Sequence, residues 1–179
     1  MTVLIGIAVA GKSVGGVIHQ PYTHPTDTVG RTVWGLKGMG VHGIDITAGP
    51  LKKGQGLHVA ASRPEYNQLL EHVIKPLNPA HCSENGGCGY KMLLVLEGKV
   101  DTSIFPSKSS FKWDTCAGDA IVYAAGGILT DINGRVIDYT YVPDKYQNET
   151  GFIMTMDKDL HLDIVSKVPA RVKDALPYM

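Results

Sequence analysis

Residues 113–127 read Trp-Asp-Thr-Cys-Ala-Gly-Asp-Ala-Ile-Val-Tyr-Ala-Ala-Gly-Gly. Small and apolar side chains recur there with the period of an α-helix, so they form one stripe that would pack against the core. Asp114 stands where an N-cap residue accepts the free N–H groups of the first turn, and the two glycines would end the helix. The pattern predicts a helix over residues 114–126.

Asp114 has two interpretations on the residues alone. The positive end of the helix dipole keeps a nearby carboxylate ionised and attracts anions, so Asp114 could bind a hard cation such as Mg2+ beside a phosphate. A plain N-cap is the commoner role of such a residue. Asp119 adds no second ligand, because a residue five positions further along a helix points about 140° away.

Residues 113–127 resemble the C-terminal signature of the lithium-sensitive, Mg2+-dependent phosphatase superfamily that includes inositol monophosphatase and fructose-1,6-bisphosphatase. Further stretches resemble one branch of it, the 3'(2'),5'-bisphosphate nucleotidases: residues 2–8, 16–22, 30–35 and 129–134. Together with residues 168–169 and 175–177, these stretches extend over nearly the whole chain. The resemblance implies that Asp114 is a ligand of Mg2+ and part of the substrate site.

The resemblance also implies the fold, an α/β arrangement of layered sheets and helices (an α+β sandwich) that is truncated at its N-terminus. Members of the superfamily place most metal ligands upstream, in a Glu-Glu segment and an Asp-Pro-(Ile/Leu)-Asp-Gly-Thr motif, and neither occurs in this chain. We therefore expect the C-terminal portion of a phosphatase, catalytically incomplete, and we assign no catalytic residue. Residues 1–52 would be a remnant of an antiparallel-sheet domain, and residues 53–179 the C-terminal α/β domain.

A glycine-rich turn, Asn-Gly-Gly-Cys-Gly-Tyr-Lys at residues 85–91, is the second candidate site. Glycines let backbone N–H groups approach an anion and Lys91 adds a positive charge, although most glycine-rich turns are only turns. The resemblance implies that Gly87 and Lys91 contact the nucleotide.

A third candidate patch surrounds Ser62 and Glu65. The resemblance places Ser62 at a substrate-binding position, whereas Glu65 replaces a histidine that contacts the nucleotide in this branch, and its negative charge would repel a phosphate. Alternatively, both residues only cap a helix over residues 64–77. The expected substrate-binding set is Ser62, Glu65, Gly87, Lys91 and Asp114.

The reaction that the resemblance implies is Mg2+-dependent hydrolysis of the 3'-phosphate of 3'-phosphoadenosine 5'-phosphate to AMP and phosphate. Residues 89–91 and 111–114 also resemble inositol polyphosphate 1-phosphatase, which is the enzymatic alternative. A non-catalytic nucleotide-binding fragment is the alternative from another class of protein.

The amino-acid composition limits which binding partners and which cellular compartment we expect for this protein. The formal net charge is zero and the pI is about 7.0, so we expect no nucleic-acid surface and no basic membrane patch. Three cysteines, Cys82, Cys88 and Cys116, are typical of a reducing compartment, and we expect a cytoplasmic monomer that binds a small molecule. His81, Cys82 and Cys88 lack the spacing of a zinc site.

The apolar run at residues 3–10 is too short to span a membrane and lacks a basic leader region, so it predicts a buried strand. A turn at Gly11-Lys12 would pair this strand with residues 14–20. Periodicity predicts further strands over 32–34, 41–46, 57–61, 100–105, 128–131 and 153–154, and helices over 64–77, 90–97, 160–165 and 170–176.

Overall fold

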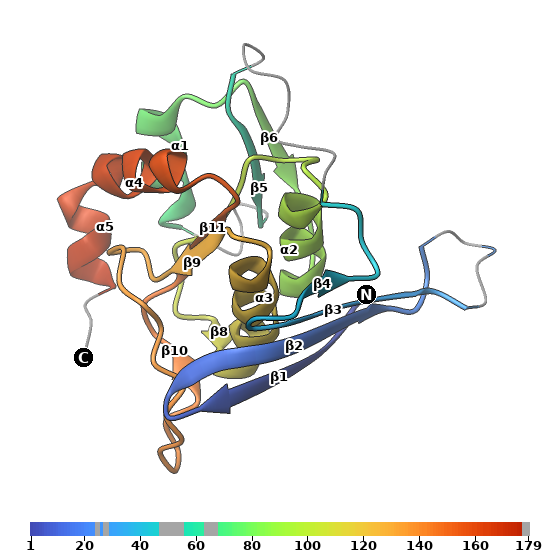
Figure 1. Cartoon of the computed structure of the whole chain (residues 1–179). Coiled ribbons are helices and arrows are strands. Elements are labelled where there is room, and N and C mark those ends of the chain that lie inside the picture. Colours follow the sequence, from blue (N-terminus) through green and yellow to red (C-terminus); the bar gives the residue numbers. More distant parts are fainter. Residues whose placement is uncertain (24–25, 27–28, 47–55, 63–67, 177–179) are drawn as a thin grey trace.

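The computed structural model describes residues 1–23, 26, 29–46, 56–62 and 68–176. Its main elements form four layers (Figure 1): a first sheet, two central helices, a second sheet, and a group of outer helices. The predicted layered α/β fold is confirmed. The expected domain boundary between residues 52 and 53 lies outside the described residues, and so does Glu65.

The first sheet is antiparallel, and its four strands follow the order β1-β2-β3-β4: Val3–Val9, Lys12–Gln20, Arg31–Leu36 and Gly40–His42. The predicted hairpin is confirmed, but its two-residue turn is Ala10-Gly11 rather than Gly11-Lys12. Both turn residues have positive φ, 49° and 74°, which a tight hairpin turn of type I′ requires. The strand predicted over 41–46 is shorter than expected, because bends follow His42.

Residues 3–9 form a strand as predicted, but the prediction that this strand is buried is wrong. Alternate side chains of β1 point away from the central helices and are 51–60% exposed: Val3, Ile5, Ile7 and Val9. β1 forms one edge of the first sheet, and in the described part of the chain no helix packs on its outer face. The apolar pattern therefore indicates a strand correctly, but it does not show how many faces of that strand are covered.

The inner face of the first sheet is made of glycines where the helix crosses it. A Cβ at Gly6 would lie 2.6 Å from Sγ of Cys116, and a Cβ at Gly16 would overlap the carbonyl oxygen of Ala117. Gly35 lies against Ile121 in the same way, with 3.1 Å between the added Cβ and the Cα of Ile121. The sheet backbone and the helix are therefore in direct contact.

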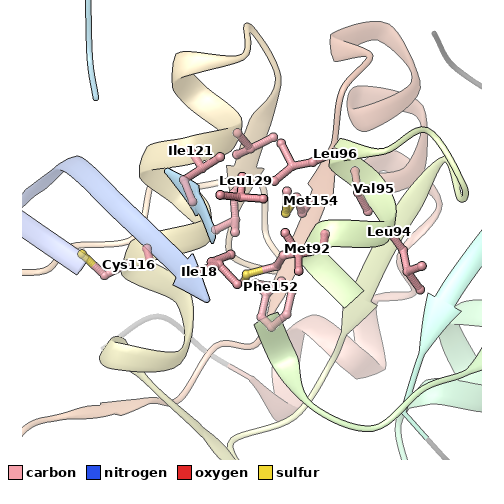
Figure 2. Close-up of a cluster of buried hydrophobic side chains, with 14 of the residues drawn as sticks. Ile18, Met92, Leu94, Val95, Leu96, Cys116, Ile121, Leu129, Phe152 and Met154 are labelled. Carbon is pink, nitrogen blue, oxygen red and sulfur yellow. The ribbon is translucent and has the colours of Figure 1, made fainter. Parts of the chain in front are cut away.

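The central layer contains α2 (Cys88–Leu96) and α3 (Lys112–Ala124). The helix predicted over 114–126 is confirmed, but it begins two residues earlier, so Asp114 is the third helical residue and Phe111 is the N-cap. The helix predicted over 90–97 also begins two residues earlier than expected. Figure 2 shows side chains of both helices meeting residues from the two sheets in one core, among them Ile18, Met92, Leu96, Ile121, Leu129, Phe152 and Met154.

The second sheet has five strands in the order β6-β5-β7-β11-β9: His81–Glu84, His58–Ala61, Thr102–Phe105, Phe152–Thr155 and Ile128–Thr130. β5 pairs in parallel with β6 and β7, whereas β11 pairs antiparallel with β7 and β9. Four of these strands were expected within two residues of their bounds. β6 is absent from the prediction because its polar, mostly exposed residues show no apolar alternation.

The outer layer consists of α1 (Leu70–Leu77), α4 (Lys158–Lys167) and α5 (Ala170–Ala175). They enclose a second core with the far side of the second sheet, which includes Val59, Ile104, Ile153, Ile164 and Val172. α1 ends at Leu77 as predicted, followed by the C-cap Asn78 with φ 43°, but its expected start at Pro64 lies outside the described residues.

A two-stranded ribbon of β8 (Ser110–Phe111) and β10 (Gln147–Asn148) leads into α3. It is also absent from the prediction, because a strand of two residues is too short to show a periodic pattern of apolar residues in the sequence. No helix in the described segments is long and apolar enough to cross a lipid bilayer.

Candidate functional site

A cavity of about 450 Å3 opens where α2 and α3 begin. The residues that line it come from the ends of β5, β6 and β7, from the glycine-rich turn, and from the start of α3: Ser62, Glu84, Asn85, Gly86, Gly87, Cys88, Lys91, Phe105, Ser109, Ser110 and Asp114. The structure thus brings together four of the five predicted substrate-binding residues. Glu65, the fifth, lies outside the described residues.

The glycine-rich turn leaves the start of α2 open to the cavity. Gly87 is the N-cap of α2 and has φ 79°, in the left-handed region that favours glycine. A Cβ at Gly86 or Gly87 would meet nothing within 4 Å, so space remains beside the turn. The first N–H groups of a helix have no acceptor within the helix, and they can therefore bind an anion that enters this space.

Lys91 points its ammonium group into this site from inside the fold. The residue is only 2% exposed, and Nζ donates hydrogen bonds to Ser62 Oγ at 2.8 Å and to the carbonyl oxygen of Asn85 at 3.4 Å. Nζ also lies 5.4 Å from the centre of the Phe105 ring, within the range of a cation–π contact. Burial lowers the pKa of Lys91, and the neighbouring Cys88 opposes this change. Ser62 thus orients a desolvated ammonium group at the cavity.

Asp114 lies at the start of α3 but is not its N-cap, so the predicted capping position is wrong. Its Oδ2 accepts a hydrogen bond from the N–H of Phe111 at 2.8 Å, as an acidic residue in the third helical position can do. Its Oδ1 has no hydrogen-bond partner among the described residues and is therefore available to a ligand. Asp114 can therefore accept the Phe111 hydrogen bond and bind a ligand at the same time, because the two interactions use different oxygens.

Cys88 is the one thiol at this cavity in the described part of the chain. Burial raises its pKa to about 12, a rise that Lys91 opposes and Asp114 reinforces. The thiol therefore stays protonated near neutral pH, and a protonated thiol is a poor nucleophile.

Among the described residues, the carboxylates at the cavity are Asp114 and Glu84. No group of three or more His, Cys, Asp or Glu among the described residues could hold a metal ion by itself. Mg2+ commonly binds proteins through one or two carboxylates and completes its shell with waters and substrate phosphates. The unpaired Oδ1 of Asp114 fits one ligand position of such an ion.

Several cavity residues were missed by the sequence reasoning: Glu84, Phe105, Ser109 and Ser110. Ser109 and Ser110 could have been found by following the chain back from Asp114, because they immediately precede α3. Glu84 and Phe105 end β6 and β7, the two strands that flank β5 in one sheet, and only the strand order reveals that they are close to the cavity.

Residues 1–172 match the inositol monophosphatase family. Human 3'(2'),5'-bisphosphate nucleotidase 1 is 38% identical over 98% of this chain and 56% of its own length, so the chain spans little more than half of that relative. Human inositol polyphosphate 1-phosphatase is 32% identical over 74% of this chain and 38% of its own length. An inositol monophosphatase from Zymomonas mobilis has the same fold, with a TM-score of 0.73, 20% identity, and coverage of 93% of this chain and 62% of that chain. The chain therefore belongs to the inositol monophosphatase family.

Proposed function

We propose that this chain forms one side of the active site of a Mg2+-dependent phosphatase that hydrolyses the 3'-phosphate of 3'-phosphoadenosine 5'-phosphate to AMP and phosphate. The proposal depends on one observation: a buried ammonium group, Lys91, and a carboxylate with a free oxygen, Asp114, line the same cavity. A phosphate and a divalent cation can bind side by side in such a cavity, each near a group of opposite charge.

The substrate class is proposed from the relatives. The greater identity with the nucleotidase than with inositol polyphosphate 1-phosphatase favours a nucleotide bisphosphate. In this chain Lys91 would pair with phosphate oxygens, and the free N–H groups that follow Gly87 would donate to the same anion. Ser62 would keep the Lys91 ammonium in position. A role for Glu65 stays a prediction.

Proteins of this family are generally Mg2+-dependent. Asp114 would hold the ion through Oδ1, while Oδ2 keeps its bond to the Phe111 N–H. When bound, Mg2+ would stabilise the charge on the transferring phosphoryl group and lower the pKa of an attacking water. Because the cavity presents Asp114 and Glu84 as its carboxylates, we expect the 179-residue chain alone to hydrolyse the substrate slowly or not at all.

Titration calorimetry with 3'-phosphoadenosine 5'-phosphate in the presence of Mg2+ tests the proposal. We expect the chain to bind the nucleotide and Lys91→Ala to bind it at least about tenfold more weakly, because a buried charge-assisted contact is lost. Lys75→Ala is the matched control, since Lys75 is an exposed lysine in the last turn of α1. Its affinity should equal that of the unchanged chain.

The outcomes separate the candidate functions. Equal affinity of the Lys91→Ala and Lys75→Ala variants would contradict the proposed site. Tighter binding of an inositol bisphosphate than of the nucleotide would support the inositol phosphatase instead. A phosphate-release assay on the same samples tests the expectation of weak hydrolysis, and turnover at the rate of a complete phosphatase would contradict that expectation.

We also propose a cytoplasmic monomer. The three cysteines are free thiols, as is usual in reducing compartments. Light scattering on the purified chain measures the oligomeric state directly, and a dimer at micromolar concentration would contradict the proposal.

A further inference from the structure

Ser110 is a cavity residue to which the proposed function assigns no role. It lies in β8, four residues before Asp114, and lines the same cavity as Lys91 and Asp114. The residue is only 4% exposed, so the direction of its hydroxyl hydrogen is set by protein neighbours and by any bound ligand rather than by bulk water.

Asn148 in β10 is the neighbour that fixes this direction. Its Nδ2 donates hydrogen bonds to Ser110 Oγ at 3.2 Å and to the carbonyl oxygen of Gly151 at 3.2 Å. The orientation of the amide is well determined, because its Oδ1 accepts from the backbone N–H of Thr150 at 3.4 Å and from the Thr150 hydroxyl at 3.0 Å. A flipped amide would place an NH2 group against a backbone N–H, and two donors cannot bond to each other.

The Ser110 oxygen therefore acts as an acceptor toward Asn148. A serine hydroxyl has one hydrogen to donate, and the bond from Asn148 leaves that hydrogen unused. No acceptor for it is found among the described residues. Because Ser110 also lines the cavity, a ligand in the cavity can accept this bond.

We propose that Ser110 donates a hydrogen bond to a phosphate oxygen of the ligand in this cavity, and that Asn148 is a positioning residue that keeps the hydroxyl aimed there. This inference rests on the proposed phosphate-binding function of the cavity. It adds a neutral donor near Asp114, on the side of the cavity where α3 begins, to the positively charged donor that Lys91 supplies on the α2 side.

The first experiment replaces Ser110 and measures the affinity for 3'-phosphoadenosine 5'-phosphate and for inorganic phosphate, each with Mg2+. We expect Ser110→Ala to weaken nucleotide binding about tenfold, because a hydrogen bond to a charged oxygen is lost. Ser110→Thr keeps the hydroxyl and should bind within about threefold of the unchanged chain. Ser166→Ala is the control, because this serine is exposed in α4 and does not line the cavity.

The second experiment reverses the bond between the two side chains. In Asn148→Asp a carboxylate oxygen replaces the NH2 group. The Ser110 hydroxyl would then donate its hydrogen to this oxygen instead of to the ligand. We expect the affinity to fall about as far as in Ser110→Ala. In the double variant the second change should cause no further loss, because the hydroxyl is already absent. A merely structural contact would alter the urea midpoint without this non-additivity in affinity.

Each result has a defined meaning. If Ser110→Ala binds the nucleotide as tightly as the unchanged chain while Lys91→Ala does not, the inference is overturned and the proposed function stands. If the unchanged chain binds neither the nucleotide nor inorganic phosphate, both are overturned. If the effects of the two single variants add, the positioning role of Asn148 is overturned. Should Ser110→Ala fail to fold, normal binding by Ser110→Thr together with weak binding by Asn148→Asp supports the inference, and equal binding by both overturns it.

Discussion

The two sheets of this molecule differ in how many of their faces are covered. The second sheet has helices on both faces, and all four residues of its strand β11 are buried. In the part of the chain that the structure describes, helix α3 covers one face of the first sheet, and on the other face the apolar side chains of β1 are exposed. Apolar strands of similar composition therefore contribute very differently to stability, depending on what packs against them.

The largest expected effect lies in the second sheet. Phe152 is fully buried between α2 and β7, and its ring stacks on Phe105 with 5.7 Å between centroids. Phe152→Ala should lower the free energy of unfolding by about 3–5 kcal/mol, because it removes buried apolar surface and leaves a cavity. Urea denaturation measures the change. A loss below about 1 kcal/mol would show that the second sheet is less tightly packed than described.

The second expected effect concerns the covered face of the first sheet. Asp119 of α3 is 8% exposed and accepts a hydrogen bond from Ser13 Oγ in β2 at 2.8 Å. Burial raises its pKa from 3.8 to about 6, so the folded protein binds the proton more tightly than the unfolded chain does. The resulting stabilisation is complete below about pH 4 and is lost as the pH rises through 6.

Asp119→Asn removes this titration and keeps a side-chain acceptor for Ser13. Its stability relative to the unchanged protein should therefore increase by about 2 kcal/mol from pH 4 to pH 7. Denaturation of both proteins across this range checks the sign. Parallel stability curves would mean that the Asp119 carboxyl is solvated in the folded state.

The smallest expected effect lies on the exposed face of the first sheet. Ile5 is 58% exposed, and threonine is equally suited to a strand, so Ile5→Thr should change the free energy of unfolding by less than about 0.5 kcal/mol. The same change should reduce self-association measured by light scattering, because exposed apolar edge strands favour it. A destabilisation as large as that of Phe152→Ala would remove the contrast between the two sheets.

The fold can be predicted from the sequence where the pattern of apolar residues extends over many positions. The apolar stripe over 113–127 predicts α3, and the turn expected at Gly11-Lys12 between two apolar runs predicts the first hairpin. The short strands β6, β8 and β10 could not be predicted, because strands of two to four residues with at most one large apolar side chain show no periodic pattern. The start of α3 was misplaced since an acidic residue is favourable both at the N-cap and in the first turn.

The candidate site was predicted in part. Ser62, Gly87, Lys91 and Asp114 were assigned to it through a family resemblance, and the structure places all four at one cavity. The pairing of Ser110 with Asn148 joins residues 38 positions apart. No local pattern encodes such a contact, because it depends on how the ribbon before α3 folds back on the chain.

The glycines beneath α3 have a consequence for ligand binding. Side chains between a helix and a sheet can adjust when one of them is enlarged, whereas two backbones in direct contact have no such tolerance. A methyl group added at Gly6 or Gly16 would therefore force the sheet and the first turns of α3 apart, close to Asp114. Substitutions at these two glycines would thus act on the cavity from a distance, although neither glycine lines it.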